Sequence, residues 1–134
     1  MTDIVLFQPK CGIWDIMGVR PPTGLLNIAS VPVSKGYKVK LIDQRINQNW
    51  KNELKKDINS GAKIICLTSM VGEQIKYMIE ISDFVKSISS KVLIVLGGSW
   101  AQTCPEICMQ NKNIDIVCCG EGDFLLTDLM KFYE

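Results

Sequence analysis

Short apolar runs alternate with segments of helical spacing along the whole sequence, and this alternation constrains the fold more than any other feature. Each run has four or five residues and is rich in β-branched side chains, as is typical of strands buried on both faces. The runs are residues 4–7, 39–42, 64–67, 92–96 and 114–118. Strands that alternate with helices pair in parallel through right-handed crossovers. The pattern therefore predicts an α/β domain built on a five-stranded parallel sheet.

Between the runs, apolar residues recur three or four positions apart, which is the spacing of an amphipathic helix. The faces expected to be buried are Leu25, Ile28, Ala29 and Val33, then Ile75, Met78, Ile79, Ser82 and Val85, then Leu125, Leu129 and Phe132. Gly36 and Gly61 stand where the first two helices should end, and Pro105 suits the first turn of a short helix. Pro32 lacks a backbone donor, so we expect the first helix to kink or end early there. Five such units fit a doubly wound, flavodoxin-like or Rossmann-like sheet of order 2-1-3-4-5.

Length and charge exclude several classes of function. The chain has 134 residues and no linker or repeat, so we expect one domain over residues 1–134. The net charge is +1 with both signs interspersed, which offers no basic surface for nucleic acid. The longest apolar run is too short to span a bilayer, and Met1-Thr2-Asp3 does not resemble a signal peptide. These features predict a cytoplasmic protein with no nucleic-acid partner and no membrane span.

The sequence has six cysteines and no histidine. Without an export signal, disulfides are not expected, and Cys66, Cys118 and Cys119 lie in apolar runs, where they suit the core. The lack of histidine excludes every histidine general base and every histidine metal ligand.

Small residues follow three neighbouring strands at the edge where doubly wound sheets bind ligands. They are Thr68-Ser69-Met70, Gly97-Gly98-Ser99 and Gly120-Glu121-Gly122. One such cluster is more often a turn, but three together favour a slot that a flat or elongated ligand could enter. The segment after the first strand, residues 8–14, contains neither a dinucleotide fingerprint nor a phosphate loop.

Several other polar and aromatic residues have a simpler structural interpretation. Trp50 suits packing at a helix start, and Asp43 a cap or loop role. Glu121 and Asp123 suit a helix N-terminus, where the helix dipole favours acids, better than catalysis. For Trp14, packing and ligand contact remain equal alternatives.

Segments in a characteristic order span nearly the whole chain. They are residues 21–30, 36–43, 64–70, 95–98 and 114–123, and the spacing of Gly97-Gly98 to Gly120-Glu121-Gly122 is the most specific part. In these segments the chain resembles the cobalamin-binding domain that precedes the radical S-adenosylmethionine domain in B12-dependent radical enzymes. The resemblance implies a corrinoid-binding module with cobalamin as cofactor and no catalytic residue of its own. It also implies a partner: a downstream catalytic domain of the same polypeptide, absent here, that holds a [4Fe–4S] cluster and S-adenosylmethionine and performs methyl transfer or related radical chemistry.

The resemblance also implies which residues meet the cofactor. Its nucleotide tail would enter the sheet edge, where the hydroxyls of Thr68 and Ser69 can bond it. The expected cofactor-binding residues are Pro9, Cys11, Trp14, Thr68, Ser69, Met70, Gly97, Gly98, Ser99, Trp100, Gly120, Glu121 and Gly122. No protein metal ligand is expected.

The sequence departs from the pattern of related domains at two places, and it also contains a partial cluster motif. Many corrinoid domains carry a cobalt-ligating histidine after the first strand, and here there is none, so no protein imidazole could ligate the metal. The resemblance implies that cobalamin would bind base-off, with Cys11, Ile13, Trp14 or water below the metal. Trp100 stands where the family often has histidine. Cys104 and Cys108 have the first spacing of a cluster motif, but Asn111 stands at the third position, so we expect no cluster here.

Two alternatives remain: a degenerate docking domain without cofactor, and a flavodoxin-like binder of flavin or nucleotide. The second is disfavoured by the missing phosphate loop. The sequence leaves the substrate and reaction of a parent enzyme open.

Overall fold

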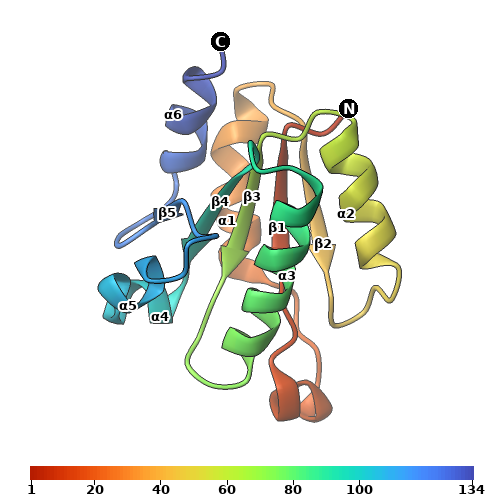
Figure 1. Cartoon of the computed structure of the whole chain (residues 1–134), viewed down its shortest axis with the longest axis vertical. Helices are drawn as coiled ribbons and strands as arrows, with labels where there is room; N and C mark the ends of the chain where they lie inside the picture. The colour runs from red at the N-terminus through yellow and green to blue at the C-terminus, as the bar shows by residue number, and fades with distance from the viewer.

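The computed structural model describes residues 1–134 and contains one five-stranded parallel sheet of order β2-β1-β3-β4-β5 (Figure 1). The strands are β1 (Ile4–Gln8), β2 (Val39–Asp43), β3 (Ile64–Thr68), β4 (Leu93–Gly97) and β5 (Ile116–Val117). All neighbouring strands pair in parallel, so their carboxyl ends meet at one edge, the lower edge in Figure 1. The predicted fold class and strand order are confirmed.

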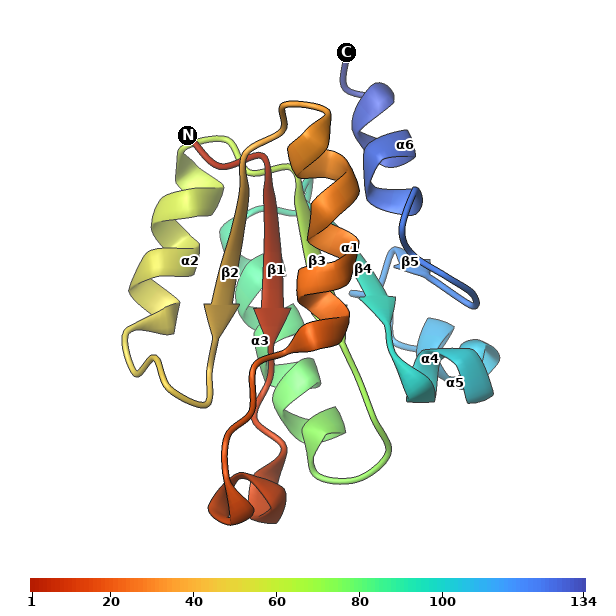
Figure 2. The ribbon, with the colours of Figure 1, turned by 180° about the vertical axis from the view of Figure 1, so that it is seen from behind.

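Helices cover both faces of the sheet. One face carries α1 (Thr23–Ser34) and α6 (Leu125–Lys131), which Figure 2 shows in front of the strands. The other carries α2 (Trp50–Asn59), α3 (Gln74–Ile88) and the short α4 (Ser99–Thr103) and α5 (Pro105–Met109). A 3-10 helix, η1 (Gly12–Met17), lies in the loop after β1, beyond the carboxyl edge. None of the helices combines the length and hydropathy that a membrane crossing requires.

Alternating side chains divide the hydrophobic core into two layers. On β1, Val5 and Phe7 point to the layer under α2 and α3, whereas Ile4 and Leu6 point to the layer under α1 and α6. Trp50 packs at the start of α2, as predicted, with its ring 5.3 Å from that of Phe7 in an edge-to-face arrangement. Strands buried on both faces explain why the apolar runs are continuous rather than alternating.

The predicted helix ends are present and have a clear cause. Pro32 lies in the last turn of α1, which ends two residues later. Gly36 has φ +91°, and its N–H bonds the Val33 carbonyl at 3.0 Å while the Tyr37 N–H bonds the Pro32 carbonyl at 3.1 Å. This is a Schellman arrangement, which ends a helix where only glycine adopts the required backbone conformation easily.

The last part of the chain differs from the sequence-based expectation. The ladder of β5 covers only Ile116–Val117, and the Cys118 N–H makes one further bond to β4, to the Leu96 carbonyl oxygen at 2.8 Å. Cys118 is half-buried, and Cys119 is exposed rather than in the core. The buried face of α6 is also rotated: Leu126 is buried, whereas Phe132 lies beyond the helix end and is 85% exposed. A single short helix has too few turns for its apolar spacing to fix the face uniquely.

Candidate functional site

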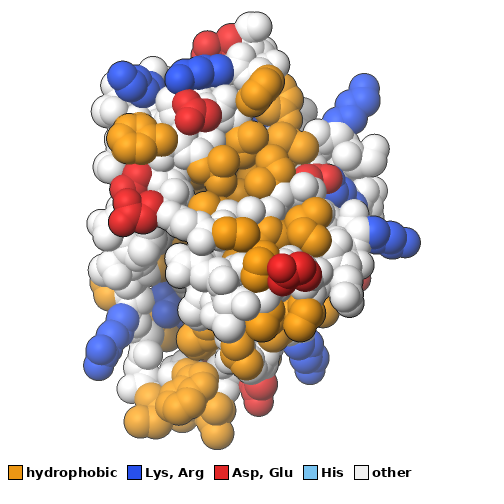
Figure 3. Space-filling view, turned by 90° about the vertical axis from the view of Figure 1, so that its left-hand side faces the viewer, with side chains coloured by type: hydrophobic (Ala, Val, Ile, Leu, Met, Phe, Trp, Pro, Cys, Tyr) orange, Lys and Arg blue, Asp and Glu red, His pale blue; other side chains and the backbone are white.

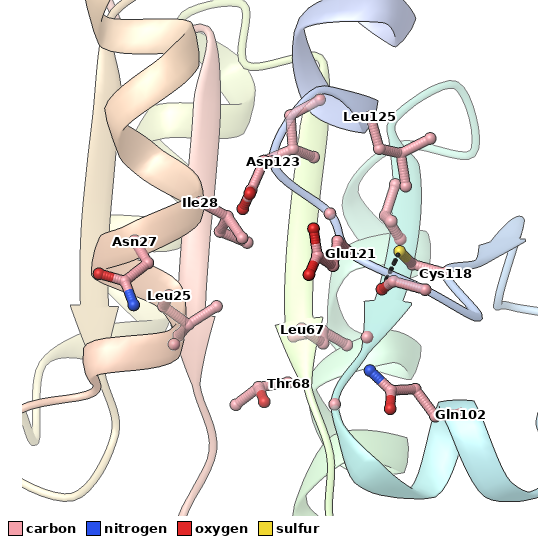
Figure 4. A pocket seen from close by; sticks show the side chains of 17 residues that line it. Leu25, Asn27, Ile28, Leu67, Thr68, Gln102, Cys118, Glu121, Asp123 and Leu125 are labelled. Carbon is pink, nitrogen blue, oxygen red and sulfur yellow. Dashed lines mark hydrogen bonds between the residues drawn. The ribbon is translucent and has the colours of Figure 1, made fainter.

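A cavity of about 320 Å³ opens at the carboxyl ends of β3 and β4, between the first turn of α1 and the segment that leads into α6 (Figure 4). It lies on the α1–α6 face of the sheet, where the chain after β5 crosses over the strand ends. The residues that line it are Gly24, Leu25, Asn27, Ile28, Leu67, Thr68, Val95, Gly97, Gly98, Gln102, Cys118, Gly120, Glu121, Gly122, Asp123, Leu125 and Leu126.

Gly97 and Gly98 lie at the end of β4 and both line the cavity, but they have different roles. A Cβ at Gly98 would lie 2.4 Å from the Ser69 carbonyl oxygen and 2.7 Å from its nitrogen, and Gly98 has φ +95°. Glycine is therefore required there because two backbone segments approach closely. Around Gly97, by contrast, nothing lies within 4 Å of the position a Cβ would take. A side chain at Gly97 would thus extend into open space on the cavity wall.

The walls are open because three more of the lining positions are also glycine. A Cβ at Gly24 or at Gly120 would meet no atom within 4 Å. Gly122 lies closer, with Ile28 Cγ2 3.6 Å and Cys118 Sγ 3.7 Å from the position of its Cβ, which is ordinary contact. Leucines and isoleucine supply the apolar part of the wall: Leu25, Ile28, Leu125 and Leu126. The shape suits a narrow, mostly apolar group.

The polar groups of the cavity include no cation. Asn27, Thr68 and Gln102 contribute neutral side chains, and Glu121 and Asp123 contribute carboxylates; no lysine or arginine lines the space. Figure 4 shows the Asp123 carboxylate in the space between α1 and β3 and the Glu121 carboxylate in front of β3. Such a cavity favours a neutral group with hydrogen-bonding atoms and disfavours a phosphate held deep inside.

Ser69 lies beneath the cavity rather than in its wall. It is 2% exposed, and its hydroxyl donates to the Gly97 carbonyl oxygen at 2.8 Å. This bond joins the loops that follow β3 and β4, and so holds the Gly97 backbone in place. The hydroxyl predicted to bond a ligand therefore supports the floor, and Thr68 is the hydroxyl that reaches the cavity.

The loop after β1 forms a second part of the same sheet edge. Cys11 is 8% exposed, and burial, with a smaller contribution from the Asp15 carboxylate, raises the pKa of its thiol. It is therefore a neutral thiol at pH 7, turned inward. Ile13 and Trp14, on η1, are 64% and 62% exposed. Asp43 is held by Arg45 through a guanidinium–carboxylate contact of 2.8 Å, in a loop role as the sequence favoured.

The cavity brings together six of the thirteen residues expected to bind the cofactor: Thr68, Gly97, Gly98, Gly120, Glu121 and Gly122. The other seven expected cofactor-binding residues lie outside the cavity. Pro9, Cys11 and Trp14 belong to the loop after β1, Ser69 and Met70 to the floor and the loop beyond, and Ser99 and Trp100 to the start of α4, where Trp100 packs on the core.

The sequence reasoning missed the wall that α1 provides. Gly24, Leu25, Asn27 and Ile28 line the cavity, although the sequence indicated only a buried helix face and a family pattern in this segment. One signal was available: glycine is a poor helix former, yet Gly24 stands in the first turn of a clear helix. A glycine in that position indicates that open space or a close approach is needed beside it.

Comparisons with known proteins identify the family and the fold of the chain. A family model described as a B12 binding domain matches residues 11–129. Among solved structures, the radical S-adenosylmethionine methyltransferase TsrM from Kitasatospora setae, with cobalamin and a [4Fe–4S] cluster bound, has a TM-score of 0.76 at 19% identity; the match covers 98% of this chain and 24% of that one. The cobalamin-dependent radical enzyme OxsB, with aqua-cobalamin bound, has a TM-score of 0.78 at 24% identity, over 98% of this chain and 19% of that one.

At these identities the two structures establish a shared fold. The chain spans about a quarter or less of the length of either enzyme. Comparison with curated proteins gives no match.

Proposed function

The chain belongs to the B12-binding domain family, and from that premise we propose that it binds cobalamin base-off, with the nucleotide tail in the cavity between α1 and α6. The domain is similar to those of cobalamin-dependent radical S-adenosylmethionine enzymes. The observation that carries the proposal is the open space at Gly97, on the wall of a cavity of about 320 Å³ at the carboxyl edge of the sheet.

The residues that line the cavity fit the nucleotide tail of cobalamin better than they fit the corrin ring. A cavity of this size lies at the lower end of the range for small-ligand pockets, about 300–1,000 Å³. It would take a flat aromatic base, but the corrin ring with its side chains is much larger and would lie outside, over the strand ends. Leu25, Ile28 and Leu126 would contact the faces of the base, and the Thr68 hydroxyl is available for a hydrogen bond.

Charge sets the depth to which the tail would enter. Because the cavity has two carboxylates and no cation, the phosphodiester of the tail would stay at the mouth, in solvent. The same charge distribution argues against a flavin or nucleotide whose phosphates must be held by the protein, since no phosphate-binding loop or basic side chain lies there.

The protein offers no strong ligand to the lower face of the metal. The chain contains no histidine, and the Cys11 thiol is buried and neutral. With the base held in the cavity, the lower face would meet exposed apolar side chains such as Ile13 and Trp14, or water. Bound cobalamin supplies a cobalt centre that can accept and pass on a methyl group or an electron.

We further propose that the chain acts together with a radical S-adenosylmethionine domain of the same polypeptide, which would hold the [4Fe–4S] cluster and perform methyl transfer or related chemistry, in the cytoplasm. The support is the length relation: matched enzymes of this fold contain the domain as about a fifth to a quarter of their chain.

The test is a titration of the protein with hydroxocobalamin and, separately, with cobinamide, which has the corrin ring but lacks the nucleotide tail. We expect saturable, stoichiometric binding of both, with cobalamin bound more tightly because only cobalamin can fill the cavity. If neither corrinoid binds to folded protein, the proposal is wrong and the docking alternative is left. Equal affinities would mean that the cavity does not hold the tail.

A further inference from the structure

Gln74 is a long polar side chain in an unusual place. It is the first residue of α3, yet it is only 3% exposed, below the carboxyl edge of the sheet. A buried amide costs free energy unless its donors and acceptor are paired.

The Gln74 amide joins two loops that are distant in sequence. Its Oε1 accepts a hydrogen bond from the Met70 backbone N–H at 2.8 Å, in the loop after β3. Its Nε2 donates to the Pro9 carbonyl oxygen and contacts the Cys11 sulfur, both at 3.2 Å, in the loop after β1. One side chain thus pairs with backbone groups of two loops, the loop after β1 and the loop after β3, which follow neighbouring strands of the sheet.

The opposite side of the β1 loop is tied to the end of β2. The Lys10 N–H donates to Gln44 Oε1 at 2.9 Å. The Arg45 guanidinium donates to the Arg20 carbonyl oxygen at 2.7 Å as well as to the Asp43 carboxylate. The base of the loop is therefore fixed from both sides.

The outer surface of the same loop is apolar and unpartnered. Ile13, Trp14, Ile16 and Met17 are between 62% and 85% exposed. In Figure 3 apolar side chains gather at the lower end of the molecule, where η1 lies. A loop that displays several large apolar side chains is a feature of ligand or partner contact, and this loop lies beyond the same carboxyl edge of the sheet at which the cavity opens.

We propose that Gln74 is a positioning residue: it clamps the β1 loop (residues 9–17) to the loop after β3 and so fixes the apolar surface on which the corrin ring rests. This inference rests on the proposed cobalamin function. It assigns corrin contact to the β1 loop and tail contact to the cavity, as two separable parts of one site. Gln74 itself touches neither.

The separation can be measured with cobinamide, which reports the corrin contact alone. Gln74→Met keeps the length of the side chain but removes the amide acceptor and donor. We expect it to weaken cobinamide and cobalamin by the same factor, about tenfold, from the loss of one or two net hydrogen bonds. Gln110→Met, at an exposed position, is the matched control and should change neither affinity.

In Gln74→Glu, protonation of the new carboxyl is expected to restore the lost hydrogen-bond donor and with it the affinity for corrinoid. As a carboxylate it keeps the acceptor for Met70 but loses the donor, whereas the protonated carboxyl has both an acceptor and an O–H donor. Burial favours the neutral form, so the affinity of this variant should recover as pH falls from about 8 to 5, while that of the wild type stays level. The two protonation states are compared in the same variant, so a difference in folding between two variants cannot cause the effect.

A measurement on the free protein distinguishes failure of the clamp from failure of the proposed function. Amide hydrogen exchange of Met70 should be about tenfold faster in Gln74→Met than in the wild type, because its acceptor is gone. If exchange accelerates but wild-type protein binds no corrinoid, the clamp exists and the proposed function is wrong. If exchange accelerates and cobinamide affinity is unchanged in both variants, the clamp does not position the corrin surface. Unchanged exchange would show that Gln74 is no clamp.

Discussion

Replacing Gly97 with leucine is the perturbation that most directly probes the cavity. No atom lies within 4 Å of the position a Cβ would take at Gly97, so the new side chain would extend into the cavity without displacing the protein. The fold should tolerate it, because Gly97 ends β4 and has no positive φ. The expected change is therefore confined to what the cavity can hold.

The magnitude follows from the area that the tail would bury. An aromatic group of this kind buries about 150–250 Å², worth about 4–6 kcal/mol at roughly 25 cal/mol per Å². Binding recovers only part of such a figure, because ordering the tail is costly. A loss of at least about 3 kcal/mol, which is about a hundredfold in Kd, is expected for cobalamin.

Cobinamide provides the internal control, because it has no tail to exclude. We expect Gly97→Leu to leave cobinamide affinity unchanged, and Gly97→Ala to have an intermediate effect on cobalamin only. Ser87→Leu, on the exposed face of α3, is the matched surface control. Titration followed by visible absorption gives the affinities, and circular dichroism checks the fold. Wild-type cobalamin affinity in well-folded Gly97→Leu would refute the placement of the tail.

Three further outcomes are expected. Gly98→Ala should lower the free energy of unfolding by about 2 kcal/mol, in denaturant titrations without any corrinoid, because its Cβ would lie 2.4 Å from the Ser69 carbonyl oxygen at φ +95°; an unchanged unfolding midpoint would contradict this. Glu121→Gln should tighten cobalamin binding a few-fold at low salt, by up to about 1 kcal/mol, since it removes an exposed charge near the tail phosphate; weaker binding would mean that the carboxylate makes an attractive contact. Burial raises the pKa of Cys66 from 9.0 to about 12, so the unfolded thiol ionises first. Stability from this group is therefore complete below about pH 9 and is lost toward pH 12, and Cys66→Val should show a shallower alkaline loss of stability in the same window.

The fold could be predicted because its determinants are local and repeated. Buried parallel strands need continuous apolar runs, and helix ends such as Gly36 need a residue that adopts a positive φ. Both leave marks within a few residues of sequence. The length of β5 could not be predicted in this way: β4 runs from Leu93 to Gly97, yet only Val95 and Leu96 pair with β5, and no local pattern marks where the pairing stops. Cys119 is therefore exposed, although its apolar surroundings in the sequence predicted a core position.

The candidate site was only partly predictable for a similar reason. The small residues at strand ends are visible in the sequence, but it does not tell that Gly98 serves a backbone contact while Gly97 faces open space. The wall from α1 and the Gln74 clamp depend on approaches between segments far apart in sequence, 65 residues in the case of Gln74 and Pro9. Such contacts follow from the packing of layers, and no local pattern encodes them.

Electron paramagnetic resonance of bound cob(II)alamin distinguishes a tail held in the cavity from a tail whose base is bound to cobalt. We expect cobalt hyperfine lines without nitrogen superhyperfine splitting, because the base would lie in the cavity and the chain has no histidine to replace it. Triplet splitting of those lines would show an axial nitrogen. With no histidine in the protein, that nitrogen would be the cofactor's own base, still bound to cobalt, and base-off binding in the cavity would be wrong.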